Sequence, residues 1–142
     1  MNPAFVVDTS VIASWLFEDE QSEYSESVLS RLDGESAIVP ALCHLEVANV
    51  LVAAERRKRI KWADAARLLD FVRGLRLMTD DTPLESRIET IVALARTHAL
   101  SAYDACYLEL AMRLSLPLAT LDRSLRNAAK EAGIPEFPGR RA

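Results

Sequence analysis

Four carboxylic acids of this sequence fall where a parallel α/β sheet would gather them. Asp8 ends the first apolar run, Glu46 lies about one helical turn after the apolar run 36–39, and Asp122 directly follows the last such run. Ligands of parallel α/β sheets bind beyond the carboxyl ends of the strands, so we expect these acids at one edge of the sheet. A fourth acid, Asp104, joins them by the geometry of the segment between it and Asp122.

Asp104 opens a helical stretch that ends near residue 115 and rises about 17 Å at 1.5 Å per residue. The strand from 117 to 122 returns roughly the same distance at about 3.3 Å per residue. This return predicts that Asp122 lies level with Asp104.

Four carboxylates at one edge repel one another and raise each other's pKa values unless a cation lies among them. A hard divalent ion such as Mg²⁺ or Mn²⁺ takes oxygen ligands and keeps several of its waters. One such water can be deprotonated to attack a phosphodiester while the metal stabilises the added charge. The acids therefore predict metal-dependent phosphodiester hydrolysis, with Thr9, Ser10 and Thr120 placed to orient carboxylates or metal-bound waters.

Each acid also has a structural role open to it. Ser101-x-x-Asp104 before an apolar run is a capping box, Asp122 can cap the last helix, and Glu46 can pair with a nearby Arg or Lys. For Asp8 the structural alternative is weakest, because a carboxylate ending a buried strand is costly without a partner. The joint placement of the acids at one edge favours the functional interpretation.

The elements that position these acids alternate along the chain. Short apolar runs at 4–8, 36–39 and 116–121, with 76–79 as a further candidate, predict buried strands. Apolar residues at helical spacing predict helices at 41–57, 65–72, 88–95 and 104–115, and the acidic, serine-rich segment 18–30 leads into another. This alternation predicts an α/β fold, with a mainly parallel central sheet flanked by helices in three layers, α/β/α.

Composition restricts the class of protein. The chain has 142 residues, half of them hydrophobic, which predicts a single domain over 1–142 with a real core. A net charge of −4 argues against coating nucleic acid by bulk charge, so any nucleic-acid role would be local. Cys43 and Cys106 lack metal-ligand spacing, and no apolar run approaches the roughly 18 residues that span a bilayer. We therefore expect a cytoplasmic protein with no membrane association.

Four motifs carry a resemblance to a known family. In order and spacing, they resemble the acidic motifs of the PIN-domain ribonucleases, and most closely the VapC-type toxins of bacterial toxin–antitoxin pairs. The motifs are VVDTSVI (6–12), HLEVANVL (44–51), SAYDACYLELA (101–111) and LATLDRSL (118–125). The likeness covers almost the whole chain. It implies a PIN-like fold and an endoribonuclease that cleaves single-stranded RNA with Mg²⁺ or Mn²⁺.

Carried over by motif, the resemblance assigns Asp8 and Asp104 as the core metal ligands, with Glu46 and Asp122 completing the acidic pocket as further or water-mediated ligands. The supporting residues that it implies are Thr9, Asn49 and Thr120, with Asn49 expected to hold Glu46 from the next helical turn. It also implies a homodimer whose site a cognate VapB-type antitoxin blocks.

Other features leave alternatives open. The basic run from Arg56 to Lys61 fits an RNA-backbone patch, or equally a solvated helix end whose cations complement the helix dipole. Tyr103 and Tyr107 are more typical of core packing than of base stacking. A receiver-like phosphoryl switch fits the strand ends less well than a nuclease, because it would need an acidic pair after the first strand and a Lys after the last. A module that binds metal for structure alone remains open.

Overall fold

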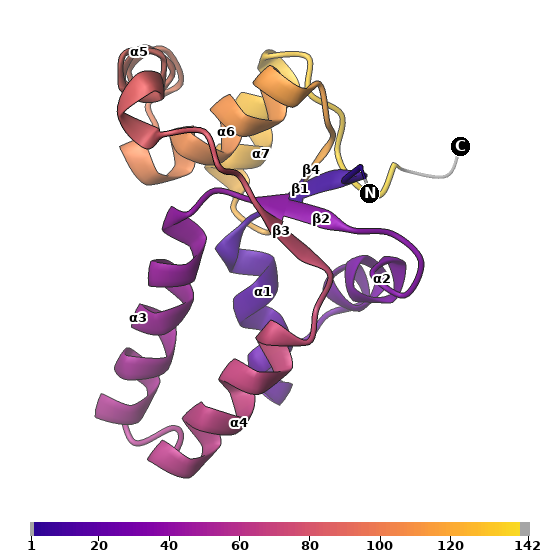
Figure 1. Ribbon diagram of the computed structural model, residues 1–142, viewed down its shortest axis with the longest axis vertical. Coiled ribbons are helices and arrows are strands. Elements are labelled where there is room, and N and C mark those ends of the chain that lie inside the picture. The colour runs from indigo at the N-terminus through magenta and orange to yellow at the C-terminus, as the bar shows by residue number, and fades with distance from the viewer. Residues whose placement is uncertain (1, 140–142) are drawn as a thin grey trace.

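The computed structural model of the protein describes residues 2–139 (Figure 1). Its central sheet has four short parallel strands: β1 (Phe5–Val7), β2 (Ala37–Val39), β3 (Leu77–Thr79) and β4 (Leu118–Ala119). The helices are α1 (Thr9–Leu16), α2 (Glu23–Arg31), α3 (Leu42–Arg56), α4 (Trp62–Arg73), α5 (Ile88–His98), α6 (Ala102–Leu114) and α7 (Arg123–Glu131). Two 3₁₀ turns, η1 (Glu18–Glu20) and η2 (Leu84–Arg87), complete the elements.

The strand order β3-β2-β1-β4 creates a switch point in the sheet. The chain moves outward from β1 through β2 to β3, and then returns to the other side of β1 to form β4. Val6 pairs in register with Ile38 on one side and with Leu118 on the other. In such sheets the crevice beyond the carboxyl ends of the two strands at the switch is the usual ligand site. Here those strands are β1 and β4. Asp8 directly follows β1, and Asp122 lies a few residues after β4.

Helices cover both faces of the sheet, which confirms the predicted three-layer α/β fold. Figure 1 shows α1, α2, α3 and α4 on one side of the strands and α5, α6 and α7 on the other. Helix α6 packs against β1 and against its neighbours α5 and α7, so every residue from 105 to 111 is buried. This burial fixes the start of α6, where Asp104 lies. Within residues 2–139, no helix combines the length and apolar character needed to cross a bilayer.

The predicted strands at 4–8, 36–39, 76–79 and 116–121 each contain an observed strand that is shorter than the apolar run. Helix α3 packs on both α1 and α4. Helix α1 has no counterpart among the predicted elements. Its eight residues follow directly from the apolar strand β1, and five of them are buried, so no clear helical period marks it in the sequence.

Candidate active site

Asp8 links the end of β1 to the start of α1 and is only 3% exposed. Its Oδ1 atom accepts hydrogen bonds from the Ser10 hydroxyl (2.6 Å) and the Val11 amide (3.4 Å), and its Oδ2 atom accepts one from the Thr120 hydroxyl (2.7 Å). Burial raises the pKa of Asp8 from 3.8 to about 6, although these hydrogen bonds act in the opposite direction. The negative charge of Asp104 makes a smaller contribution to this increase.

The hydroxyls that hold Asp8 also tie β4 to the start of α1. The Ser10 oxygen accepts a hydrogen bond from the Leu121 amide (2.9 Å), and the Thr120 oxygen accepts one from the Asp122 amide (2.9 Å). Thr120 therefore contacts Asp8 and Asp122 together, from a position that is 2% exposed. The structure places the predicted supporting residue Thr120 between two of the four acids.

Glu46 is half-buried on α3 and is held by two hydroxyls. Its Oε1 atom accepts hydrogen bonds from Thr9 Oγ1 (3.0 Å) and from the Tyr107 hydroxyl (2.6 Å), and these two hydroxyl oxygens lie 2.7 Å apart. Among residues 2–139, no hydrogen bond joins Glu46 to Asn49. Asn49 instead lines, with Glu46, Thr9 and Tyr103, a cavity of about 430 Å³. The predicted support by Thr9 is therefore observed as a contact, whereas the Asn49 contact is not.

Tyr107 is the site residue that sequence reasoning missed. It is 1% exposed and so belongs to the core, as expected, but its hydroxyl also reaches Glu46. Burial raises the pKa of this phenol far above its usual range, so the hydroxyl keeps its proton and remains a donor. A signal was present in the sequence, since Tyr107 lies three residues after Asp104 and neighbours it on the surface of α6.

Asp104 is half-buried in the first turn of α6, and Ser101 caps that helix by accepting the Asp104 amide (3.1 Å). Only this half of the predicted capping box is present among the described residues, so the Asp104 carboxylate is not engaged in capping. Burial raises the pKa of Asp104, and the negative charges of Asp122 and Glu46 raise it further. The pKa of Asp104 is thus sensitive to the charges of Asp122 and Glu46, and its own charge helps raise the pKa of Asp8.

Asp122 does cap a helix, as its structural alternative proposed. Its Oδ1 atom accepts a hydrogen bond from the Leu125 amide (2.8 Å) at the start of α7. This role does not remove Asp122 from the acidic group, because its charge still acts on Asp104. The Asp122 carboxylate thus caps α7 and also contributes negative charge to the acidic group at the sheet edge.

Among residues 2–139, no Lys or Arg side chain forms an ion pair with the acids at this edge. Within the described residues, none of Asp8, Glu46, Asp104 and Asp122 takes part in an ion pair, so the predicted alternative of a Glu46 pair with Arg or Lys is not found. Their oxygens form a hard donor set of mutually repelling carboxylates, which suits Mg²⁺ or Mn²⁺. Across residues 2–139, however, no three His, Cys, Asp or Glu side chains converge as a ready ligand cluster. The arrangement fits an ion that keeps most of its waters better than an all-protein cage.

The family model of the PIN domain matches residues 5–131, a span that contains all four acids. The chain belongs to the PIN-domain family. Its relatives include Ribonuclease VapC3 of Pyrobaculum aerophilum, which is 32% identical over 124 residues that cover 84% of this chain and 90% of that protein. The family and the α/β class predicted from the sequence are therefore confirmed.

Solved structures share the fold of this PIN domain. PAE2754 of Pyrobaculum aerophilum superposes with a TM-score of 0.70 at 23% identity, covering 90% of this chain and 87% of that one. FitAcB of Neisseria gonorrhoeae gives a TM-score of 0.64 at 21% identity, covering 89% of this chain and 93% of that one. At these identities the likeness concerns the fold alone.

In this PIN domain, part of the basic run has a structural role. The Arg59 guanidinium lies 3.1 Å from the Asp19 carboxylate and 3.7 Å from Glu20, and stacks over the Phe17 ring at 4.3 Å from its centroid. Lys61 is the N-cap residue directly before α4, and its backbone amide donates to Asp64. These contacts hold the α3–α4 turn against η1 and favour the solvated helix end over an RNA patch.

Proposed function

We propose that this PIN-domain protein is a ribonuclease of the VapC type that hydrolyses single-stranded RNA with Mg²⁺ or Mn²⁺. The observation that carries the proposal is the group of four interacting carboxylates at the sheet switch point, with no cation of the described chain paired to them. Burial of Asp8 and partial burial of Asp104 beside like charges raise the pKa of both carboxyls, so their ionised forms disfavour the metal-free fold, and a divalent cation relieves that cost. The similarity to Ribonuclease VapC3 supports RNA as the substrate.

We assign Asp8 and Asp104 as direct ligands, with Glu46 and Asp122 binding through further or water-mediated contacts. When bound, the metal supplies a water of lowered pKa and positive charge for the phosphate. Ser10 and Thr120 fix the Asp8 carboxylate by donating to its two oxygens.

Glu46 has a second, separate support. Thr9 and Tyr107 both bond to Oε1, and within the described residues Oε2 accepts no hydrogen bond, which leaves that atom available to orient a metal-bound water. The chain's own hydroxyls thereby set the direction of two of the carboxylates before substrate binds.

The motifs shared with VapC-type toxins extend the proposal to the biology. We expect a growth-inhibiting toxin that acts in the cytoplasm as a homodimer and is neutralised by a cognate VapB-type antitoxin. Expression without the antitoxin should arrest growth, and expression of Asp8→Asn should not. Growth arrest by that variant equal to the parent's would contradict a toxicity that depends on this site.

The biochemical test is cleavage of a labelled single-stranded RNA by the purified protein in Mg²⁺ or Mn²⁺. Excess EDTA should stop cleavage, because the attacking water needs the metal to ionise near neutral pH. Asp8→Asn and Asp104→Asn should be inactive, whereas the matched control Asp70→Asn, an exposed acid on α4, should keep the parent's rate. Cleavage that resists the chelator, or an active Asp104→Asn, would contradict the mechanism.

A further inference from the structure

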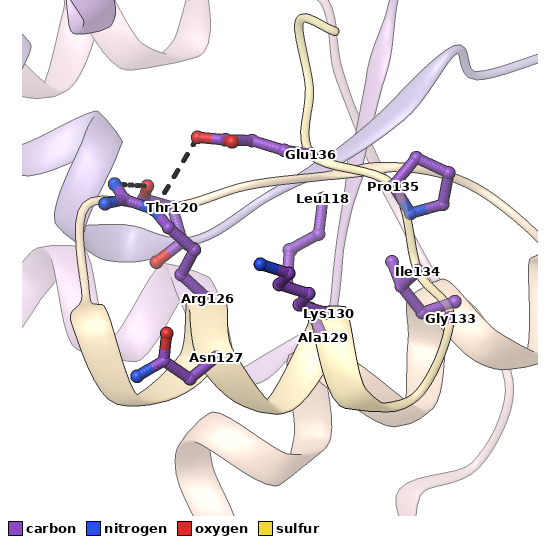
Figure 2. Close-up of a pocket in the computed structure, with 10 residues that line it drawn as sticks. All are labelled: Leu118, Thr120, Arg126, Asn127, Ala129, Lys130, Gly133, Ile134, Pro135 and Glu136. Carbon is purple, nitrogen blue, oxygen red and sulfur yellow. Dashed lines mark hydrogen bonds and ion pairs between the residues drawn. The ribbon is translucent and has the colours of Figure 1, made fainter. Parts of the chain in front are cut away.

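A cavity of about 530 Å³ lies between α7 and the segment 133–136 that follows it (Figure 2). We call it the α7 pocket and define it by Arg126, Asn127, Lys130 and residues 133–136. Its volume lies in the range typical of small-molecule sites. Figure 2 shows Arg126 and Lys130 extending from α7 on one side, with Pro135 and Glu136 on the other.

The polar face of α7 leads from the acidic edge into this pocket. Arg123, Arg126 and Lys130 stand at i, i+3 and i+7, so they line one face of the helix, while Leu125 is buried on the opposite face. From Arg123 to Lys130 the helix rises about 10 Å at 1.5 Å per residue. Because Asp122 caps this same helix, the row of cations begins beside one of the four acids.

Arg126 connects the pocket to the site through Thr120. Its Nη2 atom donates to the Thr120 carbonyl oxygen (3.0 Å), and the hydroxyl of the same threonine donates to Asp8 (2.7 Å). Its Nε atom is buried and has no hydrogen-bond partner among the described residues, with Glu136 Oε1 at 3.6 Å. A group bound against Arg126 is therefore one residue removed from the proposed metal ligand Asp8.

The charge of the pocket differs from that of the whole protein. Arg126 and Lys130 outnumber the acid Glu136, in a chain whose net charge is −4. Lys130 is exposed, and within residues 2–139 it takes part in no ion pair, so its ammonium is available to an anion. The rest of the lining includes the half-buried Ile134 and the exposed Pro135, which offer apolar contact beside the cations. Cations beside apolar surface match the phosphate and the ribose or base of a nucleotide unit.

We propose that the α7 pocket binds a nucleotide unit of the RNA strand next to the bond that is cleaved, with its phosphate on Lys130 and Arg126. This inference rests on the proposed function, because it takes the strand to pass the four acids and continue along α7. The row from Arg123 to Lys130 gives the RNA strand a path along α7 that leads away from the acidic edge. A free nucleotide has the same chemistry as one unit of the strand, and the experiment separates the two.

The test measures equilibrium binding of a fluorescein-labelled single-stranded RNA by anisotropy, in EDTA and in the Asp104→Asn background, so that cleavage plays no part. Lys130→Gln should weaken binding severalfold and lower the slope of log K against log salt by about 0.7, the value for one lost phosphate contact on a single strand. The charge-matched control Arg73→Gln, whose side chain on α4 is 75% exposed, should leave both unchanged. In the otherwise unmutated enzyme, Lys130→Gln should raise KM and leave kcat near that of the parent.

A slope in Lys130→Gln equal to that in Arg73→Gln would overturn the inference. So would AMP alone binding as tightly as the oligonucleotide in a Lys130-dependent manner, which would make the pocket a free-nucleotide site. Failure of the proposed function looks different. A protein that does not cleave RNA would contradict the nuclease, while a Lys130-dependent salt slope would still support the pocket as an RNA-backbone site.

Discussion

Replacing Asp8 with Asn should stabilise the metal-free protein at neutral pH. Burial raises the pKa of Asp8 from 3.8 to about 6, so ionising it costs more in the folded state than in the unfolded chain. A shift of about 2 pH units corresponds to roughly 3 kcal/mol at 1.36 kcal/mol per unit. Because the side chain is 3% exposed, solvent screens little of this cost.

The sign follows from proton binding. Below pH 3.8, Asp8 is protonated in both states and carries no penalty. Between pH 3.8 and about 6 the folded state holds the proton that the unfolded chain has released, so the parent loses stability as pH rises. Above pH 6 the full penalty remains. The Asn side chain of Asp8→Asn does not titrate, so the variant carries no penalty for ionisation. Its free energy of unfolding should therefore exceed the parent's by up to about 3 kcal/mol at pH 7 and match the parent's near pH 4.

The substitution keeps the local structure for two reasons. Asn caps helix N-termini about as well as Asp, so the Val11 contact is retained. The hydroxyls of Ser10 and Thr120 rotate and accept as well as donate, so they suit an amide. Urea unfolding in EDTA from pH 4 to 7.5 measures the difference, with Asp70→Asn as the exposed control that should follow the parent. An Asn variant less stable than the parent at pH 7, or one that keeps the parent's pH slope, would refute this reasoning.

Two other predictions test neighbouring features. Metal should stabilise the parent as RT ln(1 + [L]/Kd), about 2.7 kcal/mol at a hundredfold excess over Kd. Without metal, Asp104→Asn should be at least as stable as the parent, and it should lose most of the stability that the parent gains from metal. Thermal melts with and without Mn²⁺ measure both effects. A metal-induced increase in Tm as large as the parent's would exclude Asp104 as a ligand. Changing Arg56, Arg57 and Lys58 together to Gln should leave the salt slope of RNA binding unaltered, because we interpret these three exposed cations as a solvated helix end. A slope lowered by about 0.7 per residue would instead assign these three to the RNA backbone.

Much of the site follows from the sequence, because its positions are set by local geometry. A carboxylate directly after a buried strand emerges at the strand's carboxyl end, which fixes Asp8. The near-equal rise of α6 and return of the extended segment 117–122, of which Leu118–Ala119 is strand, predicts Asp122 near Asp104, and the charge of Asp122 helps raise the pKa of Asp104. The buried runs and the helical periods likewise predict the α/β class.

Only the tertiary structure decided the partners of these acids. Thr9 and Tyr107 both reach Glu46, yet they lie 37 and 61 residues from it along the chain, so no local spacing predicts their meeting. The same holds for Thr120, which bonds to Asp8 across 112 residues because β4 returns to the side of β1 away from β2. Strand order depends on how the helices pack over the sheet, a long-range property of the whole chain. The sequence by itself therefore determined which residues reach the edge, and the packing decided which hydroxyls hold them there.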